Sequence, residues 1–136
     1  MIALVICAGA VVALDWIAKL IVIRGLGERS FPLGRFGELR IVSTRMWLMR
    51  GGRAPGAPTV WVVWLSSAIS LAIGSAAFPR IGSLAGLLIG ASLAHAIETS
   101  RYGKVSDYIC LRFWPAFDLA DVALAIGAAG IVLTAF

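Results

Sequence analysis

Long apolar stretches divide the chain into four segments that can form membrane helices. A helix needs about 20 mostly apolar residues to cross the roughly 30 Å hydrocarbon core of a bilayer. The four expected helices cover about residues 1–23, 59–78, 81–98 and 118–136. The second contains no charged residue, whereas the first carries Asp15 and Lys19. We therefore predict an all-α membrane protein with four transmembrane helices in a single domain, 1–136.

Two polar connections, 24–58 and 99–117, separate these helices and are expected to lie outside the hydrocarbon. In the first, β-branched and aromatic residues from Glu38 to Arg50 are bounded by glycines, a pattern that predicts one or two short strands. Arginine recurs at positions 35, 40, 45 and 50, which suits contact with anionic lipid headgroups. The expected architecture is a helical bundle with a small β-containing loop between helices one and two.

Composition agrees with membrane residence and narrows the chemistry. The 136 residues are 60% hydrophobic and only 14% charged, too few charges to cover a soluble monomer of this size. The net charge of +5 points to membrane lipids rather than nucleic acid. Cys7 and Cys110 form no CxxC motif, one histidine is present, and no Gly-rich phosphate loop occurs, so we expect no metal and no cofactor. The first apolar stretch lacks a basic leading region and is expected to be a retained helix.

Asp15 and Lys19 stand four residues apart on one face of the first helix, where each can neutralise the other. A charge at the centre of a membrane helix costs about 2.5–3.5 kcal/mol on insertion scales, so such residues need a partner or water. The pattern predicts a buried pair that fixes helix one in the bundle. A supporting role toward headgroups or substrate stays open.

Asp118 and Asp121 stand three apart at the start of the fourth helix, and Asp107 lies in the connection before it. Capping of the helix accounts for Asp118. Capping accounts less well for Asp121 and gives Asp107 no obvious role. Two such aspartates at a low-dielectric boundary can share one proton, because like charges a few ångström apart cannot both ionise. Such a dyad supplies both a base and an acid, which an aspartic protease requires. Spacing alone does not decide between the two roles.

Residues 114–121 read Trp-Pro-Ala-Phe-Asp-Leu-Ala-Asp and resemble the Pro-Ala-Phe-Asn-x-Ala-Asp signature of the lipoprotein signal peptidases, the signal peptidase II family. Residues 90–98, followed by 103–108, resemble the family's Gly-Asn-x-x-Asp-Arg and Gly-x-Val-x-Asp-Phe blocks. Asp15 and Lys19 resemble its first-helix Asp-x-x-x-Lys. The resemblance extends over nearly the whole chain.

The resemblance implies a membrane aspartic endopeptidase that removes the signal peptide from diacylglyceryl-modified prolipoproteins. The catalytic dyad would be Asp107 and Asp121, the same two aspartates that proton sharing suggests. Residues 28–53 would form an extramembrane cradle over the site, and small residues on the third helix would leave room for the substrate. The protein would reside in the bacterial plasma (inner) membrane, with its site at the outer face.

Several positions depart from the family pattern: His95 replaces an Asn, Glu98-Thr99 replaces Asp-Arg, and Asp118 replaces an Asn. Residues 44–47 are the nearest counterpart of the family's first-loop motif. Because Glu98 follows His95 by three residues, we predict that the two hydrogen-bond and orient the catalytic loop. Asp118 adds a third carboxylate near the pair, which should raise the apparent pKa values of the site unless a cation such as Arg101 or Arg112 balances it. The residues expected to bind substrate or support the site are Asp15, Lys19, His95, Glu98, Asp118 and Arg101.

Two other functions stay open. A non-catalytic relative would bind lipidated or signal-peptide helices without cleaving them, and a small ion or solute carrier would use Asp15, Glu98 and Asp121 as proton sites.

The distribution of basic residues predicts a membrane orientation opposite to the one that the resemblance implies. Residues 25–58 and 98–117 share one side of the membrane and carry nine Lys and Arg residues, which the positive-inside rule places in the cytoplasm. The oligomeric state is not predicted.

Overall fold

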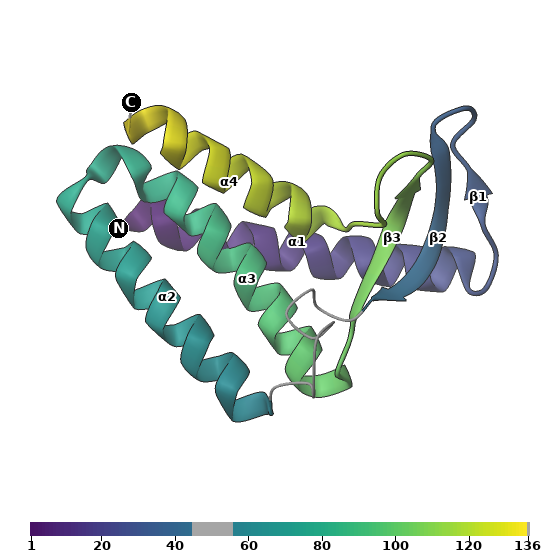
Figure 1. Ribbon diagram of the computed structural model, residues 1–136, viewed down its shortest axis with the longest axis horizontal. Helices are drawn as coiled ribbons and strands as arrows, with labels where there is room; N and C mark the ends of the chain where they lie inside the picture. The colour runs from purple at the N-terminus through teal and green to yellow at the C-terminus, as the bar shows by residue number, and fades with distance from the viewer. Residues whose placement is uncertain (45–55, 136) are drawn as a thin grey trace.

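The computed structural model describes residues 1–44 and 56–135, which form a helical bundle with a small sheet at one end (Figure 1). The helices are α1 (Ile2–Leu26), α2 (Ala57–Ala77), α3 (Gly82–Tyr102) and α4 (Leu119–Ala135), with a 3₁₀ turn, η2 (Pro79–Ile81), before α3. All four predicted helices are present, although α1 continues three residues and α3 four residues past the expected ends. The last turns of both helices contain polar residues, such as Arg24 in α1 and Arg101 in α3. A prediction from hydropathy alone ends the helix before such residues.

Three of the helices are long and apolar enough to cross a membrane, namely α1, α2, and η2 together with α3. The apolar part of α4, Leu119–Thr134, is shorter. In α2 the only buried residue is Ser75, and large side chains such as Val62 and Ile73 are about two-thirds exposed. Water would not tolerate so continuous an apolar surface, so lipid is the medium that these helices require.

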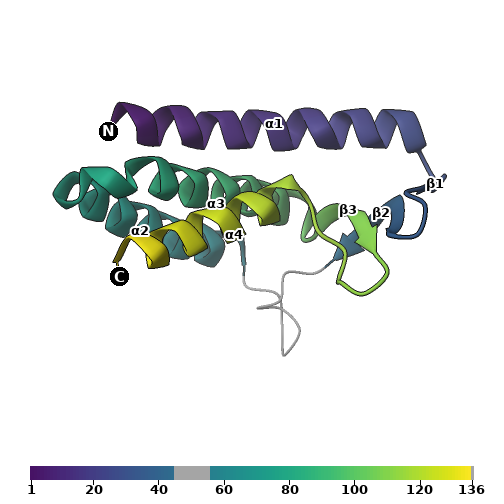
Figure 2. The same ribbon diagram turned by 90° about the horizontal axis from the view of Figure 1, so that it is seen from above.

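The sheet is antiparallel, with the order β1 (Phe31–Pro32), β2 (Gly37–Thr44) and β3 (Val105–Leu111). It lies beside the C-terminal turns of α1, whereas both chain termini lie at the opposite end of the bundle (Figures 1 and 2). The predicted strand in the first connection is confirmed as β2. The rest of that prediction, together with Arg45, Arg50 and residues 45–47 of the proposed loop motif, lies outside the described residues. Strand β3 was not predicted.

Helix α3 lies at the centre of the bundle and contacts each of the other three helices. Ala85 and Ala91 are fully buried, and Gly86 and Gly90 face α1. A Cβ atom added to Gly90 would lie 2.7 Å from the Cα of Ala8, closer than real Cβ atoms approach backbone. Small side chains therefore allow the close helix approach that stabilises bundles in lipid.

We expect Gly90→Ala to destabilise the bundle by about 1–3 kcal/mol, because the new methyl group meets backbone of α1 that cannot rotate away. Gly74→Ala is the matched control, since a Cβ atom there has nothing within 4 Å. Both changes share the gain in helix propensity. Thermal unfolding in detergent measures the difference. Equal unfolding temperatures for the two variants would contradict the close α1–α3 contact.

Candidate functional site at the start of helix α4

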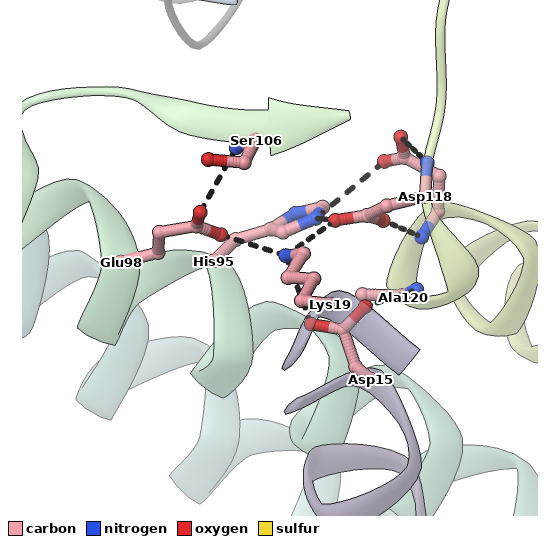
Figure 3. Close-up of polar contacts among 8 residues, drawn as sticks. Asp15, Lys19, His95, Glu98, Ser106, Asp118 and Ala120 are labelled. Atoms are coloured by element: carbon pink, nitrogen blue, oxygen red, sulfur yellow. Dashed lines mark hydrogen bonds and ion pairs between the residues drawn. The ribbon is translucent and has the colours of Figure 1, made fainter. Parts of the chain in front are cut away.

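The ammonium of Lys19 is the centre of a buried ionic network at the sheet end of the bundle (Figure 3). Its Nζ lies 2.9 Å from Asp15 Oδ2, 2.7 Å from Glu98 Oε2 and 2.7 Å from Asp118 Oδ2. The Lys19 and Asp118 side chains are 10% and 0% exposed. We call Lys19, Asp15, Glu98 and Asp118 the Lys19 network. The predicted pair of Asp15 with Lys19 is confirmed, and it extends to two further carboxylates.

The Lys19 network joins four elements of the fold. Asp15 Oδ1 accepts a hydrogen bond from the backbone N–H of Ala120 at 3.3 Å, so α1 satisfies a donor at the first turn of α4. Glu98 Oε1 accepts from the backbone N–H of Ser106 at 2.9 Å, which attaches β3 to the end of α3. Helices α1, α3 and α4 and the sheet are thus positioned by one cluster of charges.

Asp118 and Asp121 form reciprocal hydrogen bonds at the N-terminus of α4. The N–H of Asp121 donates to Asp118 Oδ1 at 2.9 Å, and the N–H of Asp118 donates to Asp121 Oδ2 at 3.3 Å. This is a capping-box arrangement, as the spacing predicted. The Asp121 side chain stays 40% exposed, whereas that of Asp118 is fully buried. The first turn of α4 therefore presents one accessible carboxylate on a fixed backbone.

Asp118, which precedes α4, is held as a carboxylate. Burial raises its pKa, but the hydrogen bonds and charges of His95 and Lys19 outweigh that effect and lower the pKa to about 2. Asp118 is therefore ionised at neutral pH and is unsuited to donate a proton. The cations that balance Asp118 are Lys19 and the protonated form of His95, whereas Arg101 and Arg112 are both exposed.

His95 pairs with Asp118 and not with Glu98, which corrects the predicted His95–Glu98 couple. Its Nε2 lies 3.2 and 3.3 Å from the two oxygens of Asp118 and 3.8 Å from Asp121 Oδ1. Glu98 is instead engaged by Lys19 and by Ser106. The two residues lie one turn apart on α3, as their spacing predicts. Glu98 nevertheless pairs with Lys19 of α1, and His95 pairs with Asp118 just before α4.

Asp107 lies in β3, where it is 5% exposed and pairs across the sheet with Val42. Residues Lys19, Ile41 and Asp107 line one small hollow. The strand is also tied to the segment before α4, because Phe117 exchanges hydrogen bonds with Ile109 at 3.0 and 3.1 Å. These contacts bring the strand that carries Asp107 to the start of the helix that carries Asp121.

Tyr108 is a buried residue of this region that was quoted in the sequence motif but given no role. Burial raises the pKa of its phenol, and the carboxylates Asp15 and Asp118 raise it further, so the group is a neutral hydrogen-bond donor and acceptor at neutral pH. The β-branched and aromatic residues within 105–111 were the signal that could have identified the strand.

His95, Asp118 and Asp121 bring one nitrogen and two carboxylate oxygens within 4.8 Å of one another. Such a set can suit a divalent cation. Here the Asp118 oxygens already accept hydrogen bonds from Lys19, His95 and the backbone of Asp121. Hydrogen bonding and ion pairing explain the arrangement, and Asp107 is not a member of this group.

The fold and the site together define a helical membrane protein with a carboxylate site beside a small extramembrane sheet. The profile of the family described as Signal peptidase (SPase) II matches residues 7–136. The chain belongs to the signal peptidase II family.

Known relatives agree with this assignment. The chain is similar to the lipoprotein signal peptidases of Methylorubrum extorquens, with 34% identity over 82 residues, and of Halothermothrix orenii, with 48% identity over 48 residues. These matches cover 52% and 35% of this chain but only 48% and 33% of the relatives, so the chain aligns with half or less of their length.

Two solved structures, described as bacterial membrane enzymes obtained by the in meso method at 1.9 and 2.3 Å resolution, share the fold. Their TM-scores are 0.83 and 0.80, each with 20% sequence identity. The superpositions cover 98% and 96% of this chain and 92% and 85% of those chains. The helical bundle with its sheet is therefore an architecture already seen in membrane enzymes.

Proposed function

We propose that the chain is an aspartic endopeptidase that cleaves the signal peptide from diacylglyceryl-modified prolipoproteins, with Asp107 and Asp121 as the catalytic pair. Membership of the signal peptidase II family supports the substrate class. The observation that carries the assignment of residues is the junction of β3 with the start of α4 through Phe117, which connects the Asp107 strand to the Asp121 helix. In this proposal α4 spans the membrane as the fourth helix.

The two aspartates divide the proton transfers of peptide hydrolysis. One, as a carboxylate, takes a proton from water while the water oxygen attacks the carbonyl carbon before the lipidated cysteine. The other, protonated, donates its proton to the carbonyl oxygen. The first then passes its proton to the departing amide nitrogen, the C–N bond breaks, and the second aspartate regains its proton from a hydroxyl of the diol as the C=O bond re-forms. Asp118 is already ionised and bound to Lys19, so it serves to hold Asp121 rather than to transfer protons.

The surroundings suit a substrate that is a lipid-anchored helix. Strand β3, which carries Asp107, and the start of α4, which carries Asp121, lie at the end of the bundle where the apolar helices meet the sheet (Figure 1). A scissile bond just outside the hydrocarbon, with the signal helix in the bilayer, would reach this level. Asp15, Lys19 and Glu98 then support the site through the Lys19 network, and Asp118 and His95 support it through the first turn of α4.

The test is processing of a diacylglyceryl-modified prolipoprotein by the purified chain in liposomes, with the same precursor lacking its lipid as control. We expect a shift to the mature size for the lipidated precursor alone. Bound but uncut precursor with a correctly folded chain would favour the non-catalytic alternative. Solute flux without any cleavage would favour the carrier.

Orientation provides a separate prediction. We propose that the sheet faces the outside of the plasma membrane, despite the basic residues around it. In a variant without Cys7 and Cys110, we expect Lys104→Cys to react with an impermeant maleimide added to intact cells. Arg80→Cys is the matched control at the opposite end, where it should react only after the membrane is opened. Both positions are exposed. The reverse labelling pattern would place the site in the cytoplasm and contradict the proposed function.

A further inference from the structure

His95 occupies a position that the proposed reaction does not use directly. It is 6% exposed, and its Nε2 lies between the carboxylate of Asp118 and that of Asp121, at 3.2 and 3.8 Å. The imidazole comes from α3, whereas both carboxylates belong to the first turn of α4. It is therefore a polar side chain of α3 that contacts the carboxylates at the start of α4, beside the alanines of both helices that pack together there.

The other donors to Asp118 keep a constant charge near neutral pH. Lys19 contributes an ammonium at 2.7 Å, and the backbone of Asp121 contributes a neutral N–H at 2.9 Å. Of these groups, only imidazole has an ordinary pKa that makes its charge change between about pH 5 and 8. A change of one charge on His95, whose own side chain is 8% exposed, would occur 3.8 Å from Asp121 Oδ1.

The charges that act on His95 come from every element around it. The nearest are the carboxylates of Asp118 and Asp121, and Lys19 of α1 contacts Asp118. The Lys19 network adds Asp15 on α1 and Glu98 on α3, and β3 carries Asp107 and the neutral Tyr108. Lys19 is the one cation in this set, and it already contacts three of the carboxylates. A protonated imidazole is thus electrostatically compatible with the surrounding carboxylates, and its proton is coupled to them.

We propose that His95 is a positioning residue for the reaction at Asp121: its Nε2–H holds the Asp118 cap, and its charge sets the protonation of the catalytic pair. This inference rests on the proposed function and goes beyond it, because it predicts a third ionisation in the pH dependence of cleavage. A purely structural histidine would leave that dependence unchanged.

The kinetic test compares pH–rate profiles of wild type, His95→Gln and Gly74→Ala with a lipidated precursor in liposomes. Glutamine can present an N–H where Nε2 stands but carries no charge. We expect His95→Gln to fold and cleave while losing one ionisation from the profile, with Gly74→Ala keeping the wild-type shape. A His95→Gln profile of wild-type shape, in a chain that cleaves, would overturn the proposal.

A second measurement does not depend on cleavage. The chain contains a single histidine, so isotopic labelling of histidine gives NMR signals from His95 alone. We expect the midpoint of its titration to move by about one pH unit or more between wild type and Asp121→Asn or Asp118→Asn. An identical midpoint in all three proteins would overturn the coupling. If wild type shows this coupling but never cleaves, the proposed function fails and the coupling stands.

Discussion

Asp121→Asn and Asp107→Asn are each expected to reduce prolipoprotein cleavage by roughly 10²- to 10⁴-fold, the contribution of a positioned acid or base. The amide keeps the shape of the carboxylate but neither takes nor gives the proton. At position 121 it also keeps an oxygen that can accept the hydrogen bond from the N–H of Asp118, so the cap of α4 should persist. The loss should therefore be one of chemistry and not of folding.

Unfolding temperature and cleavage are measured on the same preparations to separate these effects. Gly74→Ala, on α2 and away from the site, is the control and should match wild type in both. If either aspartate variant cleaves at the wild-type rate, that aspartate is not part of the catalytic pair. If a variant loses activity only together with its fold, the role of that aspartate is structural.

Lys19→Met is expected to have the largest effect on stability, a loss of about 3–5 kcal/mol. Methionine fills a similar volume but leaves three carboxylates without their cation, each within 2.9 Å of where Nζ stood. Thermal unfolding in detergent measures the change. Lys104→Met is the matched control, because Lys104 is exposed and its replacement should change little.

The mechanism of that loss can be tested by removing the unpaired charges. Adding Glu98→Gln and Asp118→Asn to Lys19→Met should restore part of the lost stability, since neutral amides tolerate burial better than isolated carboxylates. A triple variant less stable than Lys19→Met would show that the unpaired carboxylates are not the cause of the loss. Wild-type stability of Lys19→Met itself would contradict the Lys19 network.

The helices and the contacts within single helices could be predicted from the sequence. Continuous apolar stretches determine the helices because lipid leaves the backbone few alternatives. The pair of Asp15 with Lys19 and the reciprocal caps of Asp118 and Asp121 follow from helical spacing, and both are present. Boundaries shifted where α3 continues through Ser100 and Arg101, polar residues that a helix can carry beyond the hydrocarbon.

Contacts between distant segments could not be predicted from spacing. Strand β3 pairs with β2, which is distant in sequence, so the strand that pairs with residues 105–111 cannot be predicted from those residues alone. The His95–Glu98 prediction failed for the same reason: the competing partners, Lys19 and Asp118, come from other helices. The resemblance to a family supplied the pairing of Asp107 with Asp121, which neither residue's neighbours in sequence could supply.

The most direct test of the central claim is mass spectrometry of both products after wild type acts on a diacylglyceryl-modified prolipoprotein in water enriched in ¹⁸O. The account predicts one cut immediately before the lipidated cysteine, with one labelled oxygen in the carboxyl group of the released signal peptide, and product from Asp121→Asn reduced by roughly 10²-fold or more. A cut at another bond, or intact precursor retained by a folded wild-type chain, would contradict it.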